Sequence, residues 1–69
     1  MSDNVDGEIV RLLKDGELTV AFITRFLIER GFEVTRQMVE RRLRRMVSLG
    51  VVEAFYTNGN RRKHYRLAR

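Results

Sequence analysis

The hydrophobic pattern of this sequence changes its period at Gly50, and this change limits what the chain can fold into. Before Gly50, apolar residues recur three and four positions apart, as they do along one side of an α-helix. After Gly50, residues 51–56 are rich in β-branched and aromatic side chains, which is typical of a strand. Asn58 and Gly59 then suit a tight hairpin turn, because both can adopt a positive φ. The sequence therefore predicts helices followed by a β-hairpin, a mainly α domain of the α+β class.

Three segments before Gly50 have helical periodicity. We expect helices over residues 5–15, 20–30 and 36–49, a hairpin over residues 51–67, and one domain over residues 1–69. Thr19 and Thr35 are suited to cap the second and third helices, because a threonine hydroxyl can accept a hydrogen bond from a free amide of the first turn. Leu18 is expected to form a short strand against the hairpin. The apolar positions expected in the three helices are Val5, Ile9, Leu12, Leu13, Val20, Ile23, Leu27, Ile28, Val39, Leu43, Met46 and Val47.

The register of the hairpin follows from its turn. If Asn58 and Gly59 form a two-residue loop, counting outward pairs the strands residue by residue. The expected pairs are Val52 with Tyr65, Glu53 with His64, Ala54 with Lys63 and Phe55 with Arg62. Alternation then places Val52, Ala54, Tyr65 and Leu67 on the face that covers the helices.

Charge is distributed unevenly along the chain. Residues 1–35 carry four basic and seven acidic side chains, whereas residues 36–69 carry ten basic and two acidic ones, a balance of +8. A one-sided basic surface is the electrostatic mark of a nucleic-acid binder. Twelve of the fourteen basic residues are arginine, whose planar fork fits phosphate and guanine. The alternative is a basic surface that only improves solvation.

The third helix carries much of this charge on the side opposite its apolar stripe. Gln37, Arg41, Arg44 and Ser48 lie on that outer side at 100° per residue, and Arg36, Glu40 and Arg45 flank them. Glu40 is placed to pair with Arg36 or Arg45. Arg41 and Arg44 are the leading candidates for contact with base edges, with phosphate contact alone as an equal alternative. We interpret this segment as a recognition helix.

Three helices followed by a hairpin with arginine near its tip resemble the winged helix-turn-helix family, over almost the whole chain from Val5 to Leu67. Residues 36–52 resemble that family's recognition helix running into the first wing strand, and residues 58–67 resemble its wing tip and return strand. The turn over residues 30–35 is similar to that of a subtype found in ribonuclease R-type proteins and archaeal repressors. The resemblance implies that Arg36, Gln37, Glu40, Arg41 and Arg44 approach the major groove of duplex DNA, and that Arg61, Arg62 and Lys63 reach phosphate or the minor groove.

Several classes of protein are not expected. The chain has no cysteine, which excludes disulfides and thiolate metal sites, and no apolar run reaches the roughly 18 residues of a membrane span. His64 has no clustered partners that would make a metal or catalytic site. We therefore expect no enzyme activity, catalytic residue, metal or cofactor, and a cytoplasmic location, associated with the nucleoid in a prokaryote.

The leading hypothesis is a small sequence-specific protein that binds double-stranded DNA and regulates transcription. Because so short a chain leaves no room for an effector domain, repression by occupying the site is the simplest mechanism. An RNA-binding winged helix is the alternative, and a domain that docks an acidic protein is a further one. Competition between duplex DNA and RNA separates the first two hypotheses, and a salt-insensitive affinity that is equal for all nucleic acids would indicate the third.

The second helix carries more apolar residues than a three-helix core requires. Phe22 and Phe26 are neighbours, four positions apart, on the flank of the stripe. One interpretation is that the small core uses both rings, against Leu18 or the first helix. The other is a homodimer interface with these rings at its centre, since exposed aromatic patches mark contacts.

Overall fold

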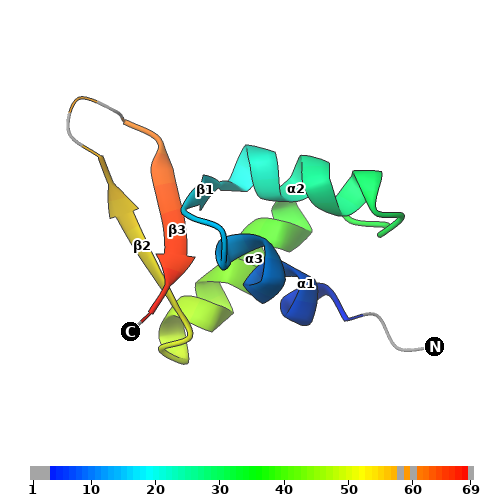
Figure 1. The fold of residues 1–69 in the computed structure, drawn as a ribbon, viewed down its shortest axis with the longest axis horizontal. Coiled ribbons are helices and arrows are strands. Elements are labelled where there is room, and N and C mark those ends of the chain that lie inside the picture. Colours follow the sequence, from blue (N-terminus) through cyan, green and yellow to red (C-terminus); the bar gives the residue numbers. More distant parts are fainter. Residues whose placement is uncertain (1–3, 58, 60, 69) are drawn as a thin grey trace.

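The computed structural model describes residues 4–57, 59 and 61–68, and in these the chain forms three helices and three short strands. They are α1 (Val5–Leu13), β1 (Leu18–Thr19), α2 (Val20–Glu29), α3 (Arg36–Ser48), β2 (Val52–Tyr56) and β3 (Lys63–Leu67). Figure 1 shows the strands gathered at one end of the molecule and α1 and α2 at the other, with α3 running between them. The expected α+β class, with three helices and a hairpin, is confirmed. Each helix ends one or two residues earlier than expected.

Local side-chain bonds set where the helices begin. The Asn4 side chain accepts a hydrogen bond from the Gly7 amide at 3.2 Å, which caps α1. The Thr35 hydroxyl accepts one from the Met38 amide at 3.2 Å, and the Thr19 hydroxyl accepts a longer one at the start of α2. Each bond satisfies an amide that has no partner within its own helix. The two predicted threonine caps are confirmed.

Glycines with positive φ end α2 and α3. Gly50 has φ 78°, and the turn around it is closed by bonds from the Gly50 amide to the Val47 carbonyl and from the Val51 amide to the Met46 carbonyl, both 3.0 Å. Gly31 ends α2 with the same pair of bonds. This arrangement satisfies the last carbonyls of the helix and needs a residue without a Cβ at the left-handed position. It turns the chain sharply from α3 into β2.

The three strands form one antiparallel sheet in the order β1-β3-β2. Leu18 pairs with Tyr65 and Thr19 with His64, so the predicted short strand at Leu18 is confirmed. β3 is therefore the central strand and joins the hairpin to the segment that leads into α2. This pairing holds the hairpin beside the start of α2.

The expected register of the hairpin is wrong by two residues. Val52 pairs with Leu67, Ala54 with Tyr65 and Phe55 with His64. The connection between the strands runs from Thr57 to Arg62, which is longer than a two-residue turn. Of the expected turn residues, Gly59 has φ 75°, and Asn58 lies outside the described residues. Because side chains alternate with period two, a shift of two keeps every residue on its expected face.

The core lies where the inner sides of the three helices meet the sheet. Its buried apolar residues are Val5, Ile9, Leu13, Val20, Ile23, Leu27, Val39, Leu43, Met46, Val52 and Tyr65. Two of the apolar residues noted in the helical patterns, Ile28 and Val47, are exposed, with 55% and 37% of their surface accessible. Each lies at the edge of its stripe, next in sequence to a residue that is buried, Leu27 or Met46. Thr24 takes a buried place on α2 by donating its hydroxyl hydrogen to the Val20 carbonyl at 2.7 Å.

Within the described residues, the longest helix, α3, has 13 residues, and no helix is both long and apolar enough to cross a membrane.

Candidate nucleic-acid interface

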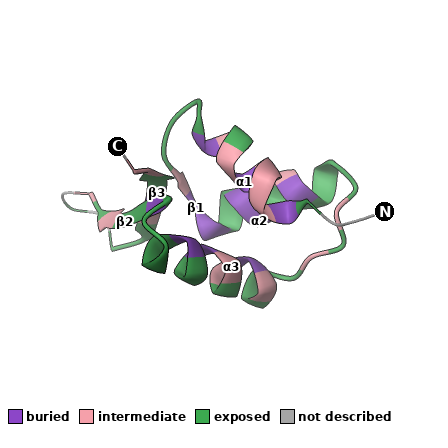
Figure 2. Ribbon diagram, turned by 90° about the horizontal axis from the view of Figure 1, so that it is seen from below, coloured by how far each residue is buried: buried purple, intermediate pink, exposed green. Residues whose placement is uncertain are grey.

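α3 presents its charged side to solvent because its other side is anchored in the core. Val39 and Leu43 are fully buried, and Met46 is almost so. Figure 2 shows α3 along one side of the molecule, with exposed segments facing away from α1 and α2. Among the predicted contact residues of this helix, Glu40 is intermediate and the others are exposed: Arg36, Gln37, Arg41, Arg44 and Arg45.

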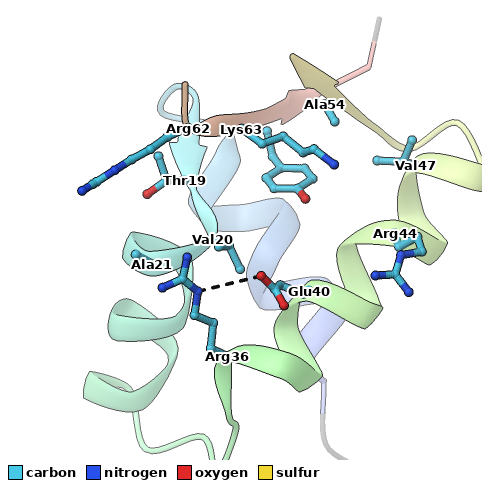
Figure 3. Close-up of a pocket in the computed structure, with 11 residues that line it drawn as sticks. Thr19, Val20, Ala21, Arg36, Glu40, Arg44, Val47, Ala54, Arg62 and Lys63 are labelled. Atoms are coloured by element: carbon cyan, nitrogen blue, oxygen red, sulfur yellow. Dashed lines mark ion pairs between the residues drawn. The ribbon is translucent and has the colours of Figure 1, made fainter. Parts of the chain in front are cut away.

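A cavity of about 450 Å³ lies between α3, the start of α2 and the hairpin. We call it the α3–wing cavity. Its lining residues are Thr19 from β1, Val20 and Ala21 from the start of α2, Arg36, Glu40, Arg44 and Val47 from α3, and Ala54, Arg62, Lys63 and Tyr65 from the hairpin. Figure 3 shows labelled side chains from all of these elements around this space. The structure thus brings together five of the predicted contact residues from two distant parts of the sequence.

The charge in the α3–wing cavity is strongly unbalanced. Among the described residues, four cations line it, Arg36, Arg44, Arg62 and Lys63, against the single carboxylate of Glu40. The Arg36 Nε and a Glu40 carboxylate oxygen are 3.9 Å apart, and both side chains are substantially exposed. A pair of this kind, one turn apart on a helix surface, contributes only about 0.3–0.5 kcal/mol. The cavity therefore remains a cationic hollow.

Tyr65 provides a polar group in the wall of this cavity. It is 7% exposed, and burial, followed by the nearby Glu40 charge, raises the pKa of its hydroxyl above the ordinary value, while Arg44 opposes the shift. The hydroxyl is protonated at neutral pH even at the ordinary tyrosine pKa, and the upward shift of its pKa strengthens this preference, so it can both donate and accept a hydrogen bond.

The remaining predicted contacts lie outside the cavity lining. Gln37, Arg41 and Arg45 are exposed along α3, and Arg61 is exposed at the hairpin tip. They extend the cationic surface beyond the cavity on both elements. The apolar part of the wall, formed by Val20, Ala21, Val47 and Ala54, was not predicted as part of a site. Only the position of Ala54 on the inner face of the hairpin, which the alternation predicts, was a sequence signal for it, because Val47 was expected within the apolar stripe of its helix.

Two other arginines of the basic half form ion pairs with carboxylates of the same protein. Arg42 Nη1 lies 3.2 Å from an Asp6 carboxylate oxygen, which joins α3 to α1. Arg66 Nε lies 2.9 Å from a Glu53 carboxylate oxygen, and its guanidinium sits 4.4 Å from the centre of the Phe55 ring. The expected pairing of Glu53 with His64 and of Phe55 with Arg62 is therefore wrong, as the shifted register requires.

The two aromatic rings of α2 lie on a different face. The centres of the Phe22 and Phe26 rings are 6.4 Å apart and the rings are stacked. Phe22 is 46% exposed, whereas Phe26 is half-buried beside the Arg30 guanidinium, at 5.8 Å. Phe26 also lines a shallow cavity of about 290 Å³ with Leu12 and Leu18. Neither ring belongs to the core cluster described above.

Among the described residues, no group of three or more histidine, cysteine, aspartate or glutamate side chains is placed to hold a metal ion. His64 Nδ1 lies 2.9 Å from the Arg62 carbonyl oxygen, to which it donates a hydrogen bond when protonated, and its ring lies against Phe55.

The order of α1, α2 and α3, the sharp turn before α3 and the hairpin beside it define a winged helix-turn-helix protein. Solved structures of the same fold include a PadR family transcription regulator from Clostridium difficile. It is 27% identical, with a TM-score of 0.86 over 96% of this chain and 73% of that protein. No protein-family model matches the chain, and no curated protein matches it.

Two further structures share the fold at lower identity. The transcriptional regulator YodB from Bacillus subtilis, in its reduced form, is 21% identical, with a TM-score of 0.80 over 96% of this chain. PadR from Bacillus subtilis, in complex with operator DNA, is 21% identical, with a TM-score of 0.74 over 87% of this chain. The chain covers 62% of the first of these proteins and 37% of the second, so both are substantially longer.

Proposed function

We propose that this chain is a sequence-specific double-stranded DNA-binding transcription regulator that represses by occupying its site. The observation that carries the proposal is the α3–wing cavity, where cations from a recognition helix and a hairpin converge. The similarity in fold and sequence to a PadR family transcription regulator supports it, as does the operator complex of a second protein of the same fold. Such a regulator acts where the DNA lies, in the cytoplasm, at the nucleoid in a prokaryote.

The proposed mode of binding follows from the dimensions of the two partners. A helix with its side chains is about 10–12 Å across, and the major groove is about 12 Å wide. α3 enters this groove with its buried side held by the core. Its outer residues then approach the base edges, namely Arg36, Gln37, Glu40, Arg41 and Arg44, while Arg45 reaches the flanking phosphates.

The hairpin completes the interface as a wing. Arg61, Arg62 and Lys63 are consecutive and exposed, and Arg62 and Lys63 line the α3–wing cavity together with residues of α3. Lysine and arginine at such a tip neutralise phosphates and release counterions, which strengthens binding without regard to sequence. In this mode of binding α3 selects the sequence, and the wing raises the affinity for duplex DNA of any sequence.

Selection of bound sequences from a random duplex pool tests this function. We expect a defined site to be enriched, and duplex DNA of that site to compete better than structured or single-stranded RNA of equal length. A protein that prefers RNA at equal charge would instead be the RNA-binding winged helix. Failure to bind either nucleic acid would point to an acidic protein partner.

We also propose a weak homodimer with Phe22 and Phe26 at its centre. Phe22 is exposed, and the two stacked rings offer a second copy a flat apolar surface. A symmetric dimer of winged helices reads two half-sites about one duplex turn apart. The small size of the patch suits an association that tightens on DNA.

Sedimentation of the wild type and of a Phe22→Ser/Phe26→Ser variant tests the dimer. We expect the variant to be a folded monomer that binds an isolated half-site no worse but the full site more weakly. Ile28→Ser is the matched control, because Ile28 is an apolar residue of the same helix, 55% exposed and separate from the ring pair. A wild type that remains monomeric at high concentration and binds one chain per site would rule the dimer out.

A further inference from the structure

The ion pair of Glu40, like that of Glu29, lies within one helix, whereas the other paired carboxylates reach a second element or turn. Glu8 pairs with Arg30 of the turn after α2, Asp6 pairs α1 with α3, and Glu53 pairs the two hairpin strands, all at 2.9–3.2 Å. The Glu40 carboxylate pairs at 3.9 Å with Arg36, one turn earlier on the same helix. Such a pair fixes no tertiary arrangement. The fold therefore makes little use of this carboxylate.

The position of Glu40 is nevertheless central to the cationic surface. Arg36, Glu40 and Arg44 are four residues apart, so they follow one another along one side of α3 at intervals of about 6 Å. In Figure 3 the Glu40 carboxylate lies between the two arginine side chains. Its influence on the pKa of Tyr65 agrees with a place inside the α3–wing cavity. A carboxylate here repels phosphate and lowers the affinity of the surface for any polyanion.

The chemistry of base edges gives this carboxylate a use. A carboxylate only accepts hydrogen bonds, and in the major groove guanine presents two acceptors and thymine presents an acceptor and a methyl group. Adenine offers its N6 amino group beside the N7 acceptor, which repels a negative charge. Cytosine offers its N4 amino group with no acceptor beside it on the same base. Cytosine is therefore the base that the carboxylate recognises best.

We propose that Glu40 is a specificity-determining residue of the DNA interface, which accepts a hydrogen bond from the N4 amino group of one cytosine in the major groove. The inference rests on the proposed function. The negative charge of Glu40 lowers the affinity for DNA of any sequence. Only where cytosine N4 donates a hydrogen bond to the carboxylate is this loss of affinity offset. Discrimination thus arises both from the favourable hydrogen bond and from repulsion elsewhere.

Parallel selections from a random duplex pool, with the wild type, Glu40→Ala and Glu29→Ala, test the proposal. Glu29 is the matched control, because it forms an exposed pair with Arg25 one turn earlier on α2, away from the α3–wing cavity. We expect the wild type and Glu29→Ala to enrich the same site, with an invariant cytosine. Glu40→Ala should lose the preference at that one position. Alanine favours helix, so circular dichroism should show unchanged helicity.

Affinity measurements then give the size of the effect. Changing the recognised cytosine to thymine should weaken wild-type binding about tenfold and leave Glu40→Ala binding unchanged. Glu40→Ala should also bind an unrelated duplex more tightly than the wild type does. The wild type should bind a site whose cytosine lacks the 4-amino group as weakly as it binds the thymine site. The affinity of Glu40→Ala should again be unchanged.

Two results would overturn the inference in different ways. If Glu40→Ala binds every duplex more tightly by one common factor and enriches the wild-type site unchanged, Glu40 acts through its charge alone and the proposed function stands. If the wild type enriches no sequence at all, the proposed function fails together with the inference. A Glu40→Gln variant separates charge from hydrogen bonding: it should keep part of the cytosine preference through its amide oxygen.

Discussion

The α1 side of the molecule and the α3–wing side both carry charged residues, but they use them differently. On the α1 side, Glu8 is only 13% exposed and lies 2.9 Å from Arg30 Nε and 3.9 Å from Arg11 Nη1, while Asp6 pairs with Arg42. On the α3–wing side, four cations and one carboxylate are found among the described residues that line the cavity.

The two sides therefore differ in how far their charges are balanced within the protein. Each paired group on the α1 side is balanced by an opposite charge of the same protein. Its removal should therefore lower the free energy of unfolding. The excess positive charge on the α3–wing side is larger than one carboxylate can balance, and a polyanion would balance it. Substitutions on the two sides should therefore change different measurements.

The largest effect is expected from replacing Arg41 and Arg44 with alanine. Both are exposed on the outer side of α3, so the free energy of unfolding should change by less than about 0.5 kcal/mol. Specific binding should weaken by about 1–3 kcal/mol for each base edge that the variant no longer binds. Titration of the selected site and of an unrelated duplex measures the two affinities, and the specific one should fall more.

Arg25→Ala is the control for this double variant. Arg25 is 70% exposed on α2, and its replacement removes one positive charge away from the α3–wing cavity. It should leave specific binding nearly unchanged. Undiminished binding of the Arg41→Ala/Arg44→Ala protein to its preferred site would show that α3 does not read the sequence.

A smaller and less selective effect is expected from neutralising the wing with Arg61→Ala, Arg62→Ala and Lys63→Ala together. Because these cations are expected to bind phosphate, affinity should fall by a similar factor on every sequence. The slope of log K against log salt should flatten by about one unit for each phosphate that the variant no longer neutralises. An unchanged slope would show that the wing does not bind the DNA backbone.

The smallest effect is expected on the α1 side, from Glu8→Ala. The removal of its two ion pairs should cost about 1 kcal/mol of unfolding free energy, which corresponds to a melting temperature lower by about 4–8 °C. Glu29→Ala, which removes an exposed pair, should cost less than about 0.5 kcal/mol. Neither change should reduce binding to DNA. Equal melting temperatures for the two variants would show that burial adds nothing to the Glu8 pairs.

Much of the fold could be predicted from the sequence because its determinants are local. Thr19 and Thr35 cap helices through bonds to amides three residues away, and Gly31 and Gly50 end them through their own backbone. The spacing of Val39, Leu43 and Met46 identifies the buried side of α3 without reference to any other element. Once that side is known, the outward direction of Arg41 and Arg44 follows.

The predictions from sequence are wrong where two arrangements of distant segments fit the local sequence pattern equally well. Two registers of the hairpin satisfy the same alternation, and the length of the loop after Tyr56 selects the one in which Val52 meets Leu67. Val47 continues the stripe of α3, but in the structure it is 37% exposed and lines the α3–wing cavity, because the hairpin and α3 leave this side of the helix open.

The sequence by itself determined the helices, their caps, the faces of the strands and the separation of acidic from basic halves, because each of these depends on neighbours within a few positions. Only the tertiary structure decided which cations are used internally, as Arg42 is by Asp6, and which line a common cavity, as Arg44 and Lys63 do. Those outcomes depend on how α3 and the hairpin are placed against each other. That placement is set by the pairing of β1 with β3, of which the sequence indicated only that Leu18 meets the hairpin, and by packing of the whole core, which no local pattern specifies.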